Sequence, residues 1–352
     1  MLLGGANVLG LDLLKENTDY FGLDIGTTTI KIVQINRAFG KNELVSFGSA
    51  PVPEGVSQSD SNIDKKKLAE EIKKLIHSMH LVTKNVMVSL PGSAVFTTVI
   101  SLPKMPASEL KKAISYQAEQ NIPLKISDVK IDWQIIGEVP SKDQVLVMII
   151  AAPISKTQKM MDICEEAGLE LSAVEINAIA AARSLATSEP LYMIVDIGTY
   201  LSEITVVKNG IASLIRSIPV GGQVITRAIA QSLGMEESQA EQFKIKFGIE
   251  QDKMEGQLYK ASKSILHNLK EEIDRSMKYY SDQFGENVPL IKITGGGSRT
   301  LGIQGFLTES LGVNVVYGNP WGMVAHKPDI TNQLNSSATD FAVAVGLAMR
   351  GF

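Results

Sequence analysis

The sequence predicts an α/β protein with two similar lobes and a smaller α+β subdomain inserted into the first lobe. The main observation is an internal repeat: residues 23–33 resemble residues 195–205, and each segment has a short apolar strand, an Asp-Ile-Gly-Thr turn and a second, alternating strand. Almost half of the 352-residue chain separates the two segments. A single repeat at that spacing indicates a duplicated domain, whereas solenoids repeat about every 20–50 residues.

Composition limits the class of protein. The chain has 34 Lys+Arg against 38 Asp+Glu, so its net charge of −4 gives no electrostatic reason to expect nucleic acid or an anionic membrane as the main partner. The only cysteine, Cys164, excludes an intramolecular disulfide and fits a reducing compartment. The longest apolar run, residues 145–152, is far shorter than the roughly 20 residues that span a bilayer, and the N-terminus lacks a basic leader. These features predict a soluble, cytoplasmic protein.

The first half of the chain is predicted to contain a lobe and an insertion. Residues 63–80 carry apolar side chains at helical spacing, and residues 43–49 and 171–174 are typical of strands. Helices at 155–168 and 177–185 complete this lobe. The insertion is expected to contain a helix at 107–120 and strands at 85–90, 95–102, 129–137 and 144–152.

The second half repeats the strand–turn–strand unit and then becomes more helical. Its further expected elements are a strand at 211–220, helices at 223–233, 236–247 and 257–284, a strand at 290–294, a helix at 303–311 and a last helix at 340–349. The predicted organisation has four parts. They are an N-terminal extension at 1–19, a first lobe at 20–84 and 153–190, an inserted subdomain at 85–152, and a second lobe at 191–350 that includes a helical subdomain at about 223–286.

The two Asp-Ile-Gly-Thr turns are candidate phosphate-binding loops. A turn rich in glycine and threonine exposes backbone N–H groups and hydroxyl donors in one direction, and Gly26 lets a ligand approach the backbone closely. The carboxylate of Asp24 would repel a phosphate, so its expected role, like that of Asp196, is to hold water on a bridging Mg²⁺. Lys31, on the second strand, would neutralise phosphate charge. An ordinary hairpin turn is the alternative for either segment alone.

Three further features suggest contacts with a nucleotide. Gly295 and Gly296 follow a predicted strand and would let a ribose or a flat ring approach the backbone. Glu241 and Lys244 lie three residues apart and therefore share a helix face. Gly222, the second of two glycines, precedes a predicted helix. Taken singly, these features also fit a helix-entry loop, a surface ion pair and a helix cap.

In this order, the motifs resemble those of the actin, sugar kinase and heat-shock-70 ATPase superfamily, over nearly the whole chain. The resemblance implies a two-lobed, actin-like ATPase fold of duplicated ribonuclease-H-like domains, with ATP (or ADP) and Mg²⁺ bound between the lobes. Asp24 and Asp196 would be the metal-side residues. The nucleotide-binding residues that the resemblance implies are Gly26, Thr27, Thr28, Lys31, Gly198, Thr199, Gly222, Glu241, Lys244, Gly295, Gly296 and Ser298.

The inserted segment narrows the resemblance. Val-Ser-Leu-Pro at residues 88–91, Ile-Ser-Leu-Pro-Lys-Met-Pro at residues 100–106 and Asp-Trp-Gln at residues 132–134 are similar to the PilM family, the actin-like proteins of type IV pilus assembly. Gly-Asn-Pro-Trp at residues 318–321 adds to this similarity. The resemblance implies the insertion subdomain shared with the FtsA cell-division proteins, and a cytoplasmic location on the inner face of the inner membrane.

The same resemblance implies a function in pilus biogenesis and twitching motility. The chain would be an ATP-binding scaffold of the inner-membrane assembly platform that binds the N-terminal cytoplasmic tail of PilN and couples its nucleotide state to complex assembly. Other platform proteins, assembly ATPases and a second copy of the chain are further implied partners; nucleic acid is not. Membrane contact would be indirect, through PilN. Residues 1–19 are interpreted as an adaptable extension that could serve as a contact segment.

At one position this sequence departs from the superfamily pattern in a way that concerns ATP hydrolysis. Asn177 begins the predicted helix at which polymerising relatives place Glu or Gln to orient the attacking water, and an asparagine cannot act as a base. Glu175, two residues earlier, is the other candidate near that position. The sequence therefore favours nucleotide binding with at most slow ATPase activity. The alternatives are an FtsA-like polymerising cell-division ATPase and a small-molecule kinase of the same superfamily.

Overall fold

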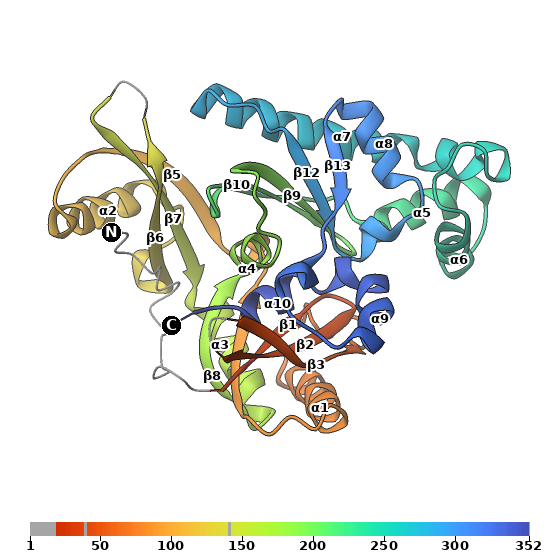
Figure 1. Cartoon of the computed structure of the whole chain (residues 1–352), viewed down its shortest axis with the longest axis horizontal. Coiled ribbons are helices and arrows are strands. Elements are labelled where there is room, and N and C mark those ends of the chain that lie inside the picture. Colours follow the sequence, from red (N-terminus) through yellow and green to blue (C-terminus); the bar gives the residue numbers. More distant parts are fainter. Residues whose placement is uncertain (1–18, 39–40, 140–141, 352) are drawn as a thin grey trace. The chain divides into compact units, whose positions relative to one another are not determined.

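The computed structural model describes residues 19–38, 41–139 and 142–351, which form two units (Figure 1). The first unit contains the described residues up to Ser184, together with Trp321–Thr331 and the segment from Val343 onward. The second unit contains Leu185–Pro320 and Asn332–Ala342. The expected N-terminal extension lies outside the described residues except for its last residue, Asp19. No helix in the described part of the chain is both long enough and apolar enough to cross a bilayer.

A five-stranded sheet forms the centre of the first unit, in the order β3-β2-β1-β4-β8. Its strands are β1 (Phe21–Ile25), β2 (Thr29–Ala38), β3 (Lys41–Pro51), β4 (Asn85–Leu90) and β8 (Glu170–Ile176). The first three are antiparallel, whereas β4 runs parallel to both β1 and β8.

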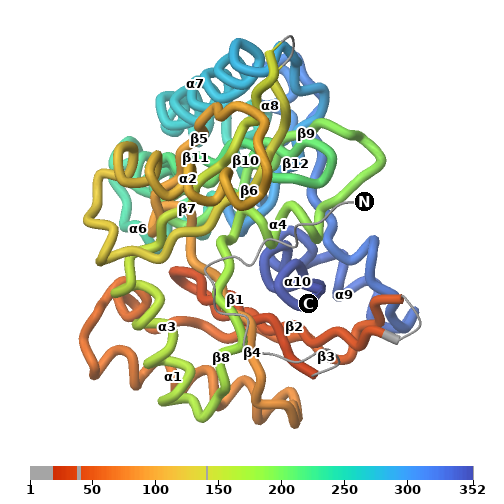
Figure 2. Tube along the Cα trace, turned by 90° about the vertical axis from the view of Figure 1, so that its left-hand side faces the viewer, coloured from red at the N-terminus to blue at the C-terminus, as the bar shows by residue number. Residues whose placement is uncertain are grey.

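Helices cover both faces of this sheet. They are α1 (Asn62–Ser78), α3 (Ile154–Glu166), α4 (Asn177–Ser184) and α10 (Ala342–Ala348). Figure 2 shows α1 and α3 on one side of the sheet and α10 on the other. Burial on both faces explains why β1 is apolar at most positions rather than alternating. Gly22 in β1 is needed because an added Cβ would overlap the Ala344 carbonyl oxygen of α10.

The second unit repeats this sheet topology. Its order, β11-β10-β9-β12-β13, again has three antiparallel strands followed by two parallel ones. The strands are β9 (Leu191–Ile197), β10 (Ser202–Lys208), β11 (Ile211–Ile218), β12 (Leu290–Thr294) and β13 (Asn314–Tyr317). The helices are α5 (Gly222–Leu233), α6 (Glu237–Phe247), α7 (Gln257–Phe284), α8 (Ile303–Leu311) and most of α9 (Thr331–Ser336). The repeated sequence segments thus occupy equivalent strands, β1–β2 and β9–β10.

A separate three-stranded sheet, in the order β5-β7-β6, lies within the first unit and has its own core. Its elements are β5 (Phe96–Pro103), α2 (Ala107–Asn121), β6 (Val129–Glu138) and β7 (Gln144–Pro153). Alternate side chains of β7, such as Val147 and Ile149, share this core with Leu110 and Ile114 of α2. The expected boundary of the insertion at residue 85 is therefore too early. β4 pairs with β1 and β8, and a short apolar strand gives no local sign of the sheet to which it belongs.

The expected extent of the second lobe, to residue 350, also needs correction. Backbone hydrogen bonds join Leu44 N–H to the Ala325 carbonyl and Ala325 N–H to the Asn42 carbonyl, both at 2.8 Å. The ring of Trp321 packs edge-on against Phe47 of β3, with 5.5 Å between ring centroids. These contacts place Trp321–Thr331 in the first unit, and α10 joins them there. They link residues about 280 positions apart, so local sequence patterns contain no trace of them.

The end of the chain is attached to the start of β1 through Tyr20. Its hydroxyl has two acceptors for its single proton, the carbonyls of Ala348, at 3.1 Å, and Arg350. The Arg37 guanidinium donates to the same Ala348 carbonyl at 2.9 Å and to the Tyr20 hydroxyl. Burial raises the pKa of Tyr20 to about 12, although Arg37 opposes the shift, so the phenol remains a donor at neutral pH. These contacts fix α10 against the sheet.

We expect Gly346→Ala to destabilise the first unit. Gly346 lies where α10 meets α4, and an added Cβ would overlap the Ala180 carbonyl oxygen. The free energy of unfolding should fall by about 1–3 kcal/mol, the usual cost of overpacking. Gly305→Ala in α8 is the matched control, because an added Cβ there meets no atom within 4 Å and should stabilise the helix by up to about 1 kcal/mol. Urea unfolding followed by circular dichroism measures both; equal effects would contradict this packing.

Candidate functional site

The two Asp-Ile-Gly-Thr turns are closed in the same way. The Gly26 N–H donates to the Thr29 carbonyl, and the Gly198 N–H donates to the Leu201 carbonyl, both at 3.0 Å. A Cβ added to Gly26 would lie 2.8 Å from the Thr29 oxygen, and one added to Gly198 would lie 2.7 Å from the Leu201 oxygen. A larger residue would push the turn open. The sequence repeat is therefore a repeat of one tight backbone conformation.

The two turns differ in charge. Asp24 and Lys31 lie opposite each other in the β1–β2 register, and Lys31 Nζ is 3.2 Å from Asp24 Oδ2. Both side chains are largely buried, with 8% and 16% exposure. In the β9–β10 register the residue opposite Asp196 is Glu203. The first turn is thus neutralised by its own lysine, whereas the second turn has two carboxylates on neighbouring strands.

Thr27 and Thr28 extend the first turn. The Thr27 carbonyl accepts a hydrogen bond from the Ser57 hydroxyl at 3.2 Å, and the Thr28 carbonyl accepts one from the Val52 N–H at 2.9 Å. Lys159 of α3 in turn donates to the Ser57 carbonyl at 3.0 Å. These bonds use the carbonyl oxygens of the two threonines and attach the turn to the segment that follows β3.

The second turn is bonded to the start of α5. The Gly222 N–H donates to the Gly198 carbonyl at 2.9 Å, and the Gln223 N–H donates to the Thr199 carbonyl at 2.8 Å. Gly221 must be a glycine, since an added Cβ would lie 2.5 Å from the Thr199 oxygen. Gly222 therefore lies beside the turn as expected, but its N–H is already used within the protein.

Lys244 of α6 is buried, and its ammonium lies against the start of α5. Its Nζ donates to the Gly222 carbonyl at 3.0 Å and to the Thr226 hydroxyl at 2.8 Å, and it lies 2.7 Å from Glu241 Oε2. A lysine ammonium has three N–H donors, and these three acceptors use them all. Thr226 also hydrogen-bonds to Glu241. Lys244 therefore joins α6 to the first turn of α5, while the Glu241 side chain remains 39% exposed.

The glycine-rich segment after β12 lies against Asp196. Gly295 has φ +82°, and an added Cβ would overlap Asp196 Oδ1. Gly297 packs equally closely on Ile197, and the Ser298 hydroxyl donates to the Gly295 carbonyl at 2.7 Å. An added Cβ on Gly222 would lie 3.6 Å from Gly297 Cα. The second unit thus brings most of its predicted site residues together around Asp196.

Two residues beside this segment, Thr339 and Asp340, are not among the predicted site residues. The Thr339 carbonyl accepts hydrogen bonds from the Gly295 N–H at 2.8 Å and from the Thr294 hydroxyl at 2.6 Å. Asp340 Oδ2 is 3.2 Å from Arg299 Nη1, whereas its buried Oδ1 has no hydrogen-bond partner within the described ranges. The predicted last helix begins at residue 340, and a local helix pattern does not indicate a contact with the glycine-rich segment.

The two candidates for orienting water differ in availability. Arg183 holds both oxygens of Glu175 in a bidentate ion pair, at 2.6 and 2.9 Å, and donates to the Gly346 carbonyl at 2.7 Å. The Glu175 side chain is only 1% exposed. Asn177 begins α4, and its buried Oδ1 has no hydrogen-bond partner among the residues that the structure describes. Glu175 is therefore a structural ion-pair member, and Asn177 alone has an unused polar atom.

The candidate residues fit Mg²⁺ only if the ion is bound together with waters and phosphates. No group of three His, Cys, Asp or Glu side chains in the described ranges could hold a metal ion by itself. Mg²⁺ is usually bound through one or two carboxylates together with waters and substrate phosphates. Asp24 and Asp196, each beside a glycine whose Cβ would fill the turn, suit that kind of binding.

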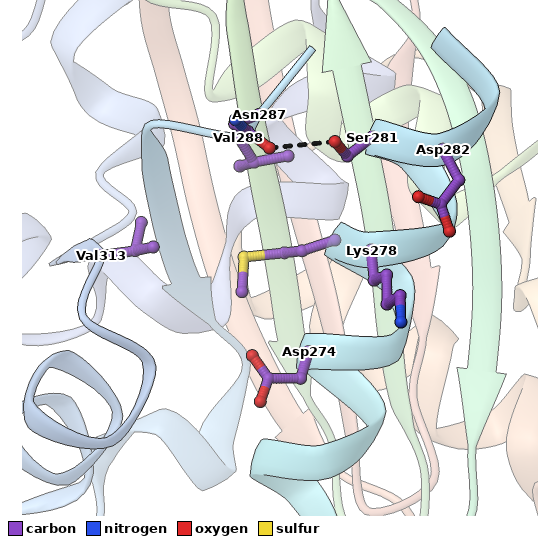
Figure 3. Close-up of a pocket in the computed structure, with 8 residues that line it drawn as sticks. Asp274, Lys278, Ser281, Asp282, Asn287, Val288 and Val313 are labelled. Carbon is purple, nitrogen blue, oxygen red and sulfur yellow. Dashed lines mark hydrogen bonds between the residues drawn. The ribbon is translucent and has the colours of Figure 1, made fainter. Parts of the chain in front are cut away.

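A cavity of about 370 Å³ lies elsewhere in the second unit (Figure 3). It is lined by Asp274, Met277, Lys278, Ser281, Asp282, Asn287, Val288 and Val313. Ser281 on α7 donates a hydrogen bond to Asn287 Oδ1 at 3.0 Å in the lining of this cavity. Asn287 and Val288 precede β12, whereas the glycine-rich segment follows it. The cavity is therefore separate from the predicted nucleotide-binding residues.

Comparison with known proteins identifies relatives over the whole described chain. The family model for the type IV pilus assembly protein PilM matches residues 22–352. The solved structure of a PilM-PilN type IV pilus biogenesis complex has a chain that is 28% identical, with a TM-score of 0.81, covering 95% of this chain and 98% of that one. The cell division protein FtsA of Neisseria meningitidis serogroup B is 28% identical over 159 residues, which are 43% of this chain and 38% of FtsA. This chain therefore spans well under half the length of that curated relative.

More distant structures share the fold alone. The ethanolamine utilization protein EutJ of Carboxydothermus hydrogenoformans is 15% identical, with a TM-score of 0.56 over 97% of this chain and 92% of EutJ. MreB 5 of Spiroplasma citri, solved with AMPPNP, is 13% identical, with a TM-score of 0.50 over 94% of this chain and 95% of MreB. Together with the duplicated sheets, these similarities confirm the predicted α/β, actin-like fold class.

Proposed function

We propose that this chain, which belongs to the PilM family of type IV pilus assembly proteins, is an ATP-binding scaffold of the pilus assembly platform that binds the cytoplasmic tail of PilN. The observation that carries the proposal is the match, over 95% of this chain and 98% of the other, to the solved PilM-PilN complex. Because the proposed partner segment is a cytoplasmic tail, the scaffold would work on the inner face of the inner membrane and contact the membrane through PilN.

The proposed binding region for the tail is within the first unit. One wall would be the three-stranded sheet with α2, and the other would be the neighbouring five-stranded sheet with its helices. A flexible tail loses conformational entropy when it binds, so apolar contacts must supply most of its affinity. The insertion offers such contacts, because Tyr116 and Ile135 are exposed there at 60% and 42%.

The nucleotide proposal rests on the two glycine-closed turns. ATP would place its phosphates at Gly26, Thr27 and Thr28 in the first unit and at Gly198 and Thr199 in the second. Mg²⁺, when bound with the phosphates, would supply positive charge beside the carboxylates of the second turn. Asp24 and Asp196 would hold waters of that ion. Gly295, Gly296, Ser298 and Glu241 would face the nucleoside.

The Asp24–Lys31 ion pair gives the first turn a specific part in binding. At 3.2 Å the ammonium is close enough to satisfy Asp24 when no phosphate is present. A phosphate oxygen competes for the same ammonium, and a charge-assisted bond to phosphate is at least as strong. Exchange of Lys31 from Asp24 to phosphate would free the Asp24 carboxylate for metal-bound water. Lys31 and Asp24 would thus change partners together.

The proposed ATPase activity is slow. Glu175 is held by Arg183, and Asn177 can accept a hydrogen bond from water but cannot take its proton at neutral pH. Bound ATP would then act mainly as a conformational ligand, through its different affinities for the states of the protein.

An FtsA-like polymerising ATPase is the second candidate, and the 28% identity to FtsA over 159 residues favours it. Nucleotide-dependent growth of light scattering, with filaments in electron micrographs, would support that candidate. A monomer or small oligomer with ATP and Mg²⁺ would support the scaffold instead.

We expect Asp24→Ala and Asp196→Ala each to weaken Mg²⁺-dependent ATP binding by about 1–3 kcal/mol, the value of a lost charge-assisted contact. Lys31→Met should weaken binding of ATP and ADP even without Mg²⁺, since it removes a direct phosphate contact. Isothermal titration calorimetry measures all three. Asp282→Ala, on α7 beside the separate cavity, is the control and should leave the affinity unchanged. Unchanged affinity in both Asp24→Ala and Asp196→Ala would remove the nucleotide from these turns.

Turnover is expected to be well below the median of about 10 s⁻¹ for metabolic enzymes. A coupled phosphate-release assay on the purified chain measures it. Asn177→Ala should lower the rate of ATP hydrolysis, because it removes the unused side-chain oxygen. Glu175→Gln should lower the free energy of unfolding more than it lowers this rate. A rate near 10 s⁻¹ that Asp196→Ala abolishes would contradict the proposed slow ATPase.

We expect the PilN tail peptide to bind the full chain with a saturable isotherm. A peptide with the same residues in scrambled order should not bind. Fluorescence anisotropy with a labelled peptide measures this binding. A variant that lacks residues 85–152 would not be a valid control for tail binding. It would also lose β4, which is an inner strand of the first unit's five-stranded sheet. If nucleotide shapes the tail site, ATP and peptide must change each other's affinity by the same factor. Equal affinity for both peptides would overturn the scaffold proposal.

A further inference from the structure

A row of polar side chains crosses the five-stranded sheet of the first unit beside its Asp-Ile-Gly-Thr turn. Strands β2, β1, β4 and β8 are neighbours in that order. Lys31 of β2 is paired with Asp24 of β1. Ser89 of β4 is paired with Glu175 of β8. The register of β1 and β4 runs up to the pair just before Asp24 and Ser89, so these two residues come next in it. Residues opposite each other on neighbouring strands share a face of the sheet, so all four side chains lie on one face.

The charged members of this row are paired, whereas Ser89 is not. Lys31 Nζ lies 3.2 Å from Asp24 Oδ2. Arg183 donates to both oxygens of Glu175, at 2.6 and 2.9 Å. Ser89 is on the strand between the two carboxylates and is only 5% exposed. Its hydroxyl has no hydrogen-bond partner in the described part of the chain. Such a group requires an explanation, because burying a hydroxyl without a partner costs free energy.

The chemistry of the neighbours indicates which group the Ser89 hydroxyl can serve. An ionised carboxylate only accepts hydrogen bonds, and a serine hydroxyl supplies one O–H donor. Glu175 already has a guanidinium donor on each oxygen, whereas the ammonium of Lys31 is bonded to Asp24 through Oδ2. The unused atom of Asn177 is an acceptor, Oδ1, so it cannot serve a carboxylate. Asp24 is therefore the acceptor that suits Ser89 best.

We propose that Ser89 is a positioning residue of the candidate site, whose hydroxyl donates to the Asp24 carboxylate when Lys31 turns from Asp24 to a phosphate. The proposal rests on the proposed function, in which Lys31 and Asp24 change partners. Asp24 is only 8% exposed, so loss of the ammonium would leave a buried charge without its cation, which is strongly unfavourable. A bond from Ser89 would satisfy one Asp24 oxygen and leave the other to accept from metal-bound water. Ser89 itself would touch no nucleotide.

The first test needs no nucleotide. Ser89→Ala in the wild-type chain removes a hydroxyl without a partner, so the equilibrium constant for folding should stay within about twofold or rise. In a Lys31→Met chain, Asp24 has lost its ammonium and Ser89 should donate to it. There, Ser89→Ala should lower the constant by at least about tenfold, the value of a hydrogen bond to a charged group. Urea unfolding of the four chains at neutral pH measures both effects. Equal effects in the two chains would overturn the proposal.

Two further variants are controls for this cycle. Ser172 of β8 also has a buried hydroxyl without a partner among the described residues, and it is 2% exposed. It lies nearer the other end of its strand, three residues before Glu175. Ser172→Ala should therefore have the same effect in the wild-type and Lys31→Met chains. Ser89→Thr keeps the hydroxyl, so its effect should also be the same in both. A Ser172→Ala effect that depends on Lys31 as strongly as that of Ser89→Ala would make the coupling non-specific and overturn the proposal.

The second test measures ATP binding by calorimetry. Without Mg²⁺, Ser89→Ala should weaken ATP binding by about tenfold, because the Asp24 carboxylate that Lys31 leaves then has no donor. In the Lys31→Met chain, Ser89→Ala should change the ATP affinity by less than about twofold, since no ammonium leaves Asp24. If the wild-type chain binds no ATP, the proposed function and this inference both fail. If the wild-type and Ser89→Ala chains bind ATP equally well, only the inference about Ser89 is wrong.

Discussion

One hydrogen bond, from a glycine N–H to a carbonyl three residues later, closes each Asp-Ile-Gly-Thr turn, and the candidate site in each unit is arranged around it. Because the bond requires Gly26 and Gly198 to lie against the oxygens of Thr29 and Leu201, no side chain fits there. The turn also fixes the ends of two adjacent strands, so Asp24 and Asp196 occupy equivalent positions in their sheets. The geometry of the aspartates thus follows from the backbone of the turns.

Around this shared backbone the two units have diverged in charge and in support. The first turn is balanced by Lys31 and held from behind by Ser57 and Lys159. The second turn has Glu203 in place of the lysine and is held by the N–H groups of α5. Duplication therefore preserved the closing hydrogen bond, while the residues that compensate the aspartate changed.

The sequence was sufficient for the features that repeat or alternate locally. The two turns, the strands beside them and the helix stripes followed from spacing alone, and the order of motifs was enough to indicate the fold class. What it could not show depends on contacts between distant segments. β4 is an apolar strand whose sheet is chosen by β1 and β8, and Ala325 returns to pair with Asn42 and Leu44. Asp340 lies beside the glycine-rich segment, where the preceding Thr339 carbonyl accepts hydrogen bonds from the Gly295 N–H and the Thr294 hydroxyl.

Lys244 shows how a motif can be present while its residues are used differently from a first interpretation. Sequence spacing pairs it with Glu241, but its ammonium donates inward to Gly222 and Thr226 and uses all three of its N–H groups. A direct contact from Lys244 to a ribose would require it to give up one buried acceptor, which costs about 1–3 kcal/mol for the group left unsatisfied. Glu241 is exposed enough to accept from a ribose hydroxyl without that loss. If the nucleotide binds here, Glu241 makes the contact and Lys244 positions the carboxylate that makes it.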